Sequence, residues 1–333
     1  MDWYSLYSEC PRMVLGLSLS AGLLVYYMLE AVKRPLLACR HSAWRGFLET
    51  NLTILKERYW PTPWCYESRC QTILASVLRS RLPDITYKRE LLELKDGGQI
   101  CLDWLETTSE VDQPIIIILP GLTGSSQSEY VKSFTARTYC AANSDDLEEA
   151  IEHIRAKFPK APLMATGISL GGMILGNYLV TRGEQAAQHL VAAMVLSIPW
   201  NVFVGTESLE KPLWNLLLNR HLANCLCESI RSMRKQLEGD YKWDLDHVME
   251  VLYGIPVEAA NKSSHVAIIV TARGGHIGFM EGVFPTNTYY SDRIYKQLVN
   301  GIFSNLDKIK EVKREADEHA QLIAADSTNG SVS

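Results

Sequence analysis

One stretch limits what this chain can fold into more than any other: Ala165 to Val180, with the sequence ATGISLGGMILGNYLV. An apolar segment enters a Gly-x-Ser-x-Gly motif, and a second apolar segment of helical character leaves it. Glycines two positions on either side of Ser169 remove side chains that would collide with a neighbouring strand and helix. The stretch therefore predicts a strand, a strained turn that projects the hydroxyl of Ser169, and a helix that follows at once.

Strand and helix patterns alternate along much of the chain. Ile115 to Leu119 is a β-branched run ending in Leu, which is typical of a strand buried on both faces. A hairpin is predicted from Asp84 onward, with its turn at Asp96-Gly97-Gly98. Further expected elements are a helix opened by Asn143, a strand at 189–199, a buried strand at 265–276 and a closing amphipathic helix at 291–306. This alternation predicts an α/β fold with a mainly parallel sheet.

The N-terminal region carries a membrane signal. Met13 to Leu29 contains no charged residue and is within the length that can span a bilayer. A cleaved signal peptide is the main alternative, but charged residues and a proline follow the segment instead of a small-residue cleavage site. We therefore expect a single-pass anchor at 13–32, in the endoplasmic reticulum or another endomembrane. More basic residues follow this segment than precede it closely, which favours a cytosolic domain.

Composition divides the remainder into three parts. They are an arm at 36–83, an α/β domain at 84–313 with cap-like helices at about 200–250, and a flexible tail at 314–333. The arm contains RYWPTPWC, Arg58 to Cys65, where prolines between aromatic residues indicate an irregular segment. Packing onto the domain is the simpler interpretation of this segment, and membrane contact or substrate entry is the functional one.

Several function classes find no support in the sequence. The net charge is −5, and neither a basic stripe nor a nucleic-acid-binding motif is present. The eight cysteines are irregularly spaced, without the Cys and His spacing of a zinc site. No nucleotide fingerprint occurs, because the Pro120–Gly124 loop lacks the Gly-x-x-x-x-Gly-Lys pattern. We therefore expect no metal, no organic cofactor and no nucleic-acid partner.

Ser169 is the candidate nucleophile. Since a helix begins right after it, the backbone N–H of Leu170 points to where an oxyanion would form. A second donor is expected from Leu122 in LPGLTGSS, a loop that follows the buried strand at 115–119. The structural alternative is a Gly-rich turn with a bystander serine.

A serine needs a base to take its proton, and His276 is the candidate. It ends a buried strand in TARGGHIGF and has Gly274, Gly275 and Gly278 around it, so the backbone can approach closely. It also follows Ser169 in the chain, which is the order found in α/β-hydrolases. The other seven histidines lack this setting and are interpreted as structural.

Five motifs together resemble one family: LPGLTGSS, RTYCAANSDDLE, GISLGGM, SLEKPL and GGHIGFMEG. They are similar to the membrane-anchored α/β-hydrolase-domain lipases, members one and three of that numbered series (AB hydrolase superfamily, family 4). The resemblance covers about residues 13–310. It implies an α/β-hydrolase fold, an N-terminal membrane helix, and hydrolysis of carboxylic esters in lipids such as phosphatidylcholine. It places the nucleophile on Ser169 and the base on His276.

The chain departs from that family in two places, as a shortened form would. After LPGLTGSS the family has a helix and an interior strand, and too few residues remain here for both. Before Gly254 the family has a strand carrying the triad acid, and no such strand is visible here. Candidate substitutes for the acid are Asp244, Asp246 and Glu207, none of them favoured. The alternative function is therefore a catalytically impaired form that only binds lipid or a partner at the membrane.

Overall fold

The structure is a computed structural model of the chain. It describes residues 11–79, 83–105, 112–122, 124–128, 130–131, 138–139, 144–198, 257–285 and 289–329. The expected cap-like helices at 200–250 lie outside these residues, as do Asn143 and the three candidate acids Glu207, Asp244 and Asp246.

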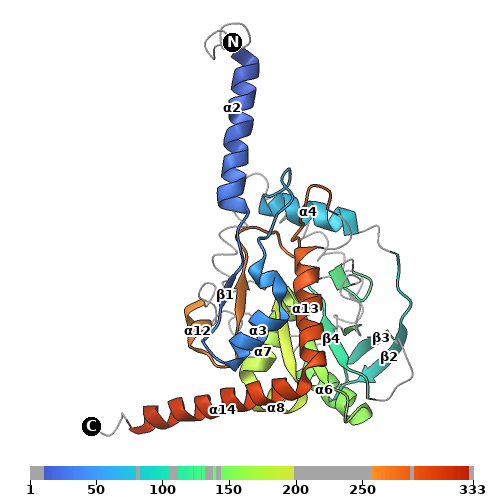
Figure 1. The fold of residues 1–333 in the computed structure, drawn as a ribbon. Coiled ribbons are helices and arrows are strands. Elements are labelled where there is room, and N and C mark those ends of the chain that lie inside the picture. Colours follow the sequence, from blue (N-terminus) through green and yellow to red (C-terminus); the bar gives the residue numbers. More distant parts are fainter. Residues whose placement is uncertain are drawn as a thin grey trace, which may run out of the picture.

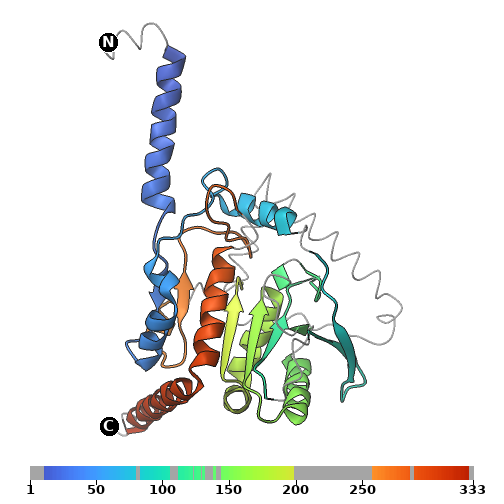
Figure 2. The same ribbon diagram turned by 45° about the vertical axis from the view of Figure 1, so that its right-hand side comes forward.

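A six-stranded, mainly parallel sheet forms the centre of the domain (Figures 1 and 2). Its strand order is β2-β3-β5-β4-β6-β7, with bounds Lys88–Glu93, Gln99–Trp104, Thr138–Tyr139, Ile115–Leu119, Leu163–Ile168 and Ala192–Leu196. Strands β5, β4, β6 and β7 run parallel, and β2 and β3 form the predicted antiparallel hairpin at one edge. The predicted α/β class and its mainly parallel sheet are therefore confirmed.

The hairpin turn has the geometry that its sequence demands. Gly97 adopts φ 87°, a value that favours glycine because it has no Cβ. The N–H of Gly98 donates to Asp96 Oδ1 at 2.8 Å, which closes the turn locally.

Helices cover both faces of the sheet. On one face lie α6 (Ser144–Lys157), α7 (Leu170–Thr181) and α8 (Gly183–His189), and on the other α3 (Ala43–Asn51), α13 (Tyr290–Ser304) and α14 (Leu306–Asn329). The remaining described helices are α2 (Pro11–Tyr26), α4 (Ser68–Arg79), α12 (Val257–Lys262), the π-helix η1 (Tyr27–Ala31) and the 3-10 helix η2 (Thr53–Lys56). The domain is thus a three-layer α/β/α arrangement.

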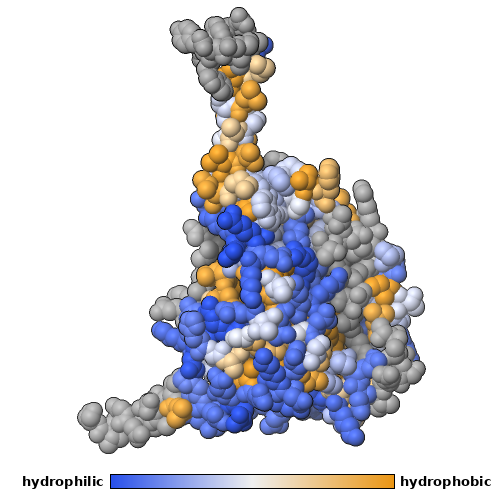
Figure 3. Space-filling model, viewed as in Figure 1, coloured by the Kyte–Doolittle hydropathy of each residue, from blue (hydrophilic) through white to orange (hydrophobic). Residues whose placement is uncertain are grey.

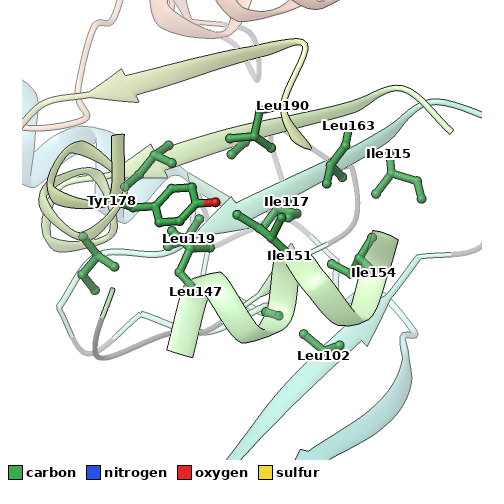
Figure 4. Close-up of a cluster of buried hydrophobic side chains, with 14 of the residues drawn as sticks. Leu102, Ile115, Ile117, Leu119, Leu147, Ile151, Ile154, Leu163, Tyr178 and Leu190 are labelled. Carbon is green, nitrogen blue, oxygen red and sulfur yellow. The ribbon is translucent and has the colours of Figure 1, made fainter. Parts of the chain in front are cut away.

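Strand β4 shows why the sequence specifies this layering. Alternate side chains of a strand point to opposite faces, so a strand buried on both faces must be apolar throughout. Ile117 of β4 packs with Leu147 and Ile151 of α6, as Figure 4 shows. Its neighbour Ile118 packs on the opposite face with α3 and α13.

The interior strand that the family has after the LPGLTGSS loop, which the sequence predicted to be missing here, is shortened but present. Strand β5 has only two residues, Thr138 and Tyr139, yet it lies between β3 and β4 in the sheet. The short chain between β4 and α6 leaves room for a minimal strand but not for a full helix and strand.

The strand before His276 differs from the sequence prediction. Strand β8 (Ile268–Val270) is three residues long and pairs antiparallel with β1 (Leu36–Ala38) in a separate two-stranded sheet. Among the described residues no strand lies between β7 and β8, although Ile269 and Met194 contribute to the same apolar cluster. The position expected for a missing strand, before Gly254, is outside the residues that the structure describes.

The described part of the chain begins and ends with a helix. At the N-terminal end, Arg12–Ala31 forms a helix of 20 residues that is long and apolar enough to cross a membrane, and only 6% of its most apolar window is buried. At the other end, α14 continues to Asn329, where the sequence predicted a flexible tail from residue 314. Ile309, Val312 and Ala316 are buried along one side of this helix, so its first part packs on the domain, while its charged residues made the sequence resemble a solvated tail.

Candidate active site

The turn between β6 and α7 holds Ser169 in a strained conformation. Ser169 has φ 55° and ψ −117°, which non-glycine residues rarely adopt. A Cβ at Gly167 would lie 2.4 Å from the carbonyl oxygen of Gly171, and one at Gly171 would lie 2.3 Å from that of Leu119. The two glycines of the motif are therefore required by the close packing of β4, β6 and α7.

The structure brings Ser169 and His276 together from positions 107 residues apart in the chain. Ser169 Oγ lies 2.8 Å from His276 Nε2, a normal hydrogen-bond distance. Ser169 stands at the carboxyl end of β6, and His276 stands on the loop after β8. In this pair the hydroxyl can donate to a neutral imidazole, which is the arrangement that serine nucleophiles need.

Three hydrogen bonds hold the loop that carries His276. The N–H of His276 donates to Thr72 Oγ1 at 2.8 Å, and the N–H of Ile277 donates to Ser197 Oγ at 3.2 Å. Arg79 Nη1 donates to the carbonyl oxygen of Ile277 at 3.1 Å. These bonds fix a residue in an unfavourable backbone conformation, since Ile277 has φ 64° although it is β-branched.

Helix α4 of the arm supplies two of these anchors, a role that sequence analysis missed. A Cβ at Gly275 would lie 2.5 Å from the carbonyl oxygen of Ser68, and one at Gly278 would lie 2.5 Å from that of Gln71. The glycines around His276 therefore allow the loop to approach α4. No local signal marks Thr72 or Arg79 in the sequence, because their partners are about two hundred residues away.

The environment of His276 favours its neutral form. Although its ring reaches solvent, the protein atoms around it desolvate it and lower its pKa below the ordinary value for histidine. Within the described part of the chain, no carboxylate forms a hydrogen bond with its Nδ1. The candidate site thus holds a serine and a base, and none of the described carboxylates is bonded to that base.

The N–H groups of Leu122 and Leu170 remain the candidates for the oxyanion hole. Leu170 is the first residue of α7, where N–H groups have no partner within the helix. Leu122 lies in the loop after β4, and a Cβ at the preceding Gly121 would lie 3.1 Å from Ser169 Cβ. The N–H of Gly121 donates to Tyr130 Oη at 2.9 Å, which holds this loop beside the serine. Neither the N–H of Leu122 nor that of Leu170 donates a hydrogen bond to any of the described residues.

A metal site finds no support in the same residues. In the part of the chain that the structure describes, no group of three or more His, Cys, Asp or Glu side chains is placed to hold an ion.

No protein-family model matches the chain. The chain is 34% identical to human Phospholipase ABHD3, in an alignment that covers 86% of this chain and 90% of the relative. The chain belongs to the α/β-hydrolase domain family. Within this family it is also 27% identical to the Caenorhabditis elegans protein abhd-3.2, over 77% of this chain and 88% of that one.

The alignment with the human relative also shows that this family member is shortened internally. It extends over 374 positions, more than the 333 residues of the entire chain, so the relative has residues opposite gaps in this sequence. The comparison thus agrees with the omissions expected from the motifs.

Solved structures resemble the chain only in part. Est1E from Butyrivibrio proteoclasticus aligns with a TM-score of 0.29 and 14% identity, over 33% of this chain and 51% of that one. XC6422 from Xanthomonas campestris, described as an α/β serine hydrolase without a lid, aligns with a TM-score of 0.28 and 18% identity, over 36% of this chain and 65% of that one.

Proposed function

We propose that this protein is a membrane-bound serine hydrolase that cleaves carboxylic esters of lipids, of the phospholipase or carboxylesterase type. One observation carries the proposal: Ser169 Oγ lies 2.8 Å from His276 Nε2 at the strained turn after β6. Family membership supports the chemistry, since the human relative is named a phospholipase. Phosphatidylcholine or a similar acyl lipid is the proposed substrate.

The proposed reaction uses four groups of this chain. Ser169 Oγ attacks the ester carbonyl carbon while His276 Nε2 takes the hydroxyl proton, and the N–H groups of Leu122 and Leu170 donate to the oxyanion. When the tetrahedral intermediate collapses, the ester C–O bond breaks and His276 passes its proton to the leaving alcohol. Water, deprotonated by His276, then attacks the acyl-enzyme, which releases the fatty acid and restores Ser169.

The location of the protein is part of the proposal. The helix Arg12–Ala31 would span the membrane once, with the α/β domain on the cytosolic side of an endomembrane. A lipid substrate agrees with this placement, because its acyl chains are found in the bilayer in which the helix is anchored.

A fluorophosphonate probe tests the nucleophile. We expect the purified full chain to be labelled and Ser169→Ala to lose all labelling. Ser264 offers a matched control: its Oγ lies 3.1 Å from His265 Nδ1, and His265 Nε2 lies 2.9 Å from Asp317 Oδ1. That group has a serine, a histidine and an acid but no strained turn, so Ser264→Ala should label like the unchanged chain. Labelling that persists in Ser169→Ala would refute the assignment.

The alternative function is a membrane protein that binds lipid or a partner without turnover. It is favoured because no carboxylate among the described residues bonds to His276 Nδ1. Loss of the acid in a serine protease lowers turnover by about 10⁴. The same probe separates the two functions when a thermal melt is run beside it. A cooperative melt with strong labelling supports the enzyme, and a cooperative melt without labelling supports the binding protein.

A further inference from the structure

The base of the membrane helix is fixed to the domain by side chains rather than joined through a free linker. Tyr27 Oη donates to the carbonyl oxygen of Pro61 at 2.5 Å, and Arg273 Nη2 donates to Tyr26 Oη at 2.7 Å. The ring of Tyr66 lies 6.1 Å from that of Tyr26 and 6.0 Å from that of Tyr27. The helix therefore leaves the domain in a set direction, as Figures 1 and 2 both show.

Two loops beside this junction are joined to each other. The N–H of Gly282 donates to the carbonyl oxygen of Trp60 at 3.0 Å, and Trp64 Nε1 donates to that of Val283 at 2.7 Å. An isolated bridge between Pro61 and Glu281 completes the pairing. The loops 60–64 and 281–284 thus form one structural unit at the foot of α2, because Pro61 also accepts the hydrogen bond from Tyr27.

This unit exposes large apolar side chains, which we call the aromatic rim. Its members are Trp60, Trp64, Val283 and Phe284, which are 45%, 60%, 55% and 85% exposed. Exposed aromatic residues gathered in one place mark an interaction surface more often than chance exposure does. Figure 3 shows hydrophobic surface along α2 and again beside its base, whereas much of the rest of this face is hydrophilic.

The aromatic rim lies at the same end of the domain as the candidate site. Helix α4 lies beside the foot of α2 and holds the loop of His276 through Thr72 (Figure 1). On its outer side, α4 exposes Ile73 and Val77 by 46% and 52%. Arg273, which binds Tyr26, is only three residues before His276. The membrane helix, the rim and the base of the site are therefore connected through a few side chains.

We infer that the aromatic rim rests in the interfacial layer of the bilayer that α2 enters, so that the Ser169–His276 site faces the lipid surface. The inference rests on the proposed function for the lipid substrate. A phospholipid interface fits this surface because Trp side chains prefer the boundary between headgroups and acyl chains. Arg34, exposed just after the helix, offers a positive charge to lipid phosphates, whereas Lys33 beside it pairs with Glu30 at 2.8 Å. A substrate lipid would then reach Ser169 without leaving the bilayer completely.

Brominated lipids test this placement without relying on catalysis. Phe284→Trp adds a fluorophore to the rim, and Val180→Trp adds one at a side chain that is likewise 85% exposed but lies at the end of α7 next to α8. The full chain is placed in phosphatidylcholine vesicles whose acyl chains carry bromine near the headgroups. We expect at least half of the added fluorescence of Phe284→Trp to be quenched, and that of Val180→Trp to be unaffected. The inference would be overturned if the two variants were quenched equally, or if neither were quenched.

A second comparison tests what the rim does for the reaction. The pair Trp64→Ser and Phe284→Ser is compared with the pair Leu91→Ser and Val180→Ser, whose side chains are 61% and 85% exposed elsewhere on the domain. We expect the first pair to reduce hydrolysis of vesicle phosphatidylcholine at least fivefold, with labelling by a soluble fluorophosphonate unchanged. Equal vesicle rates for the two pairs would contradict the inference. Should the unchanged chain fail to label, the proposed function falls, and the quenching result still decides the position of the rim.

Discussion

Arg79 and Asp292 form an ion pair of 2.7 Å that is almost completely buried beneath the loop of His276. Their side chains are 4% and 2% exposed, and Arg79 also donates to the carbonyl oxygen of Ile277. The guanidinium lies 4.1 Å from the ring centre of Tyr289, so it is enclosed on several sides. The pair thus connects α4 and α13 to the backbone next to the candidate base.

We predict that Arg79 is a positioning residue for His276. Arg79→Lys keeps the charge but cannot hold Asp292 and Ile277 with the same planar group. Since small misplacements of reacting groups are costly, fluorophosphonate labelling should slow about tenfold or more at a temperature well below the melting transition. Arg89→Lys is the control, because Arg89 also pairs with an aspartate at 2.7 Å but is 61% exposed and away from this loop. If Arg79→Lys lowers the melting temperature but leaves the labelling rate unchanged, Arg79 has only a structural role.

The pH dependence of labelling reports on His276. Desolvation lowers the pKa of His276, so the imidazole should stay neutral to a pH below the ordinary histidine value of about 6.5. Only the neutral ring can take the proton of Ser169, and labelling should therefore be lost on the acid side of that value. The measurement is the rate of labelling by a soluble probe from about pH 4.5 to about pH 8, at points about half a pH unit apart. An acid limb above pH 7 would indicate a carboxylate at Nδ1, because a nearby negative charge raises the pKa of histidine.

The parts of this protein that the sequence predicts are those encoded by neighbouring residues. The Gly-x-Ser-x-Gly turn needs only the glycines at 167 and 171. A Cβ at Gly167 would collide with the backbone of α7, and one at Gly171 with the backbone of β4. The two-sided burial of β4 is likewise visible in its unbroken apolar run. Such features could be located to within one or two residues.

The features that the sequence did not predict depend on contacts between distant segments. Nothing near Thr72 or Arg79 indicates that α4 holds the loop of His276. Strand β8 pairs with β1, whose own three residues carry no strong strand signal. Helix α14 continues past residue 314, where Ala316 is still buried, although the sequence there is mostly charged and polar.

Two glycines of α7 predict opposite effects of the same substitution. A Cβ at Gly171 would lie 2.3 Å from the carbonyl oxygen of Leu119, so Gly171→Ala must displace backbone at the turn. A Cβ at Gly176 would meet nothing within 4 Å, so Gly176→Ala should stabilise the helix by about 0.5–1 kcal/mol. We expect Gly176→Ala to raise the melting temperature by about 1–4 °C and Gly171→Ala to lower it while abolishing labelling. A folded, fully labelled Gly171→Ala would show that the turn tolerates a side chain.

Three glycosylation sequons can report the orientation of the domain: Asn51-Leu52-Thr53, Asn261-Lys262-Ser263 and Asn329-Gly330-Ser331. Asn51 Nδ2 donates to the carbonyl oxygen of Phe47 at 2.8 Å within α3, and Asn305 Nδ2 lies 3.3 Å from Asn51 Oδ1. Asn261 of α12 is exposed. With a cytosolic domain, glycosidase treatment of the chain made in microsomes should leave its gel mobility unchanged, while a sequon placed in an N-terminal tag should be modified. A shift that disappears when Asn261→Gln and Asn329→Gln are combined, and persists in Asn51→Gln, would place the domain in the lumen, and with it the aromatic rim on the lumenal surface of the bilayer.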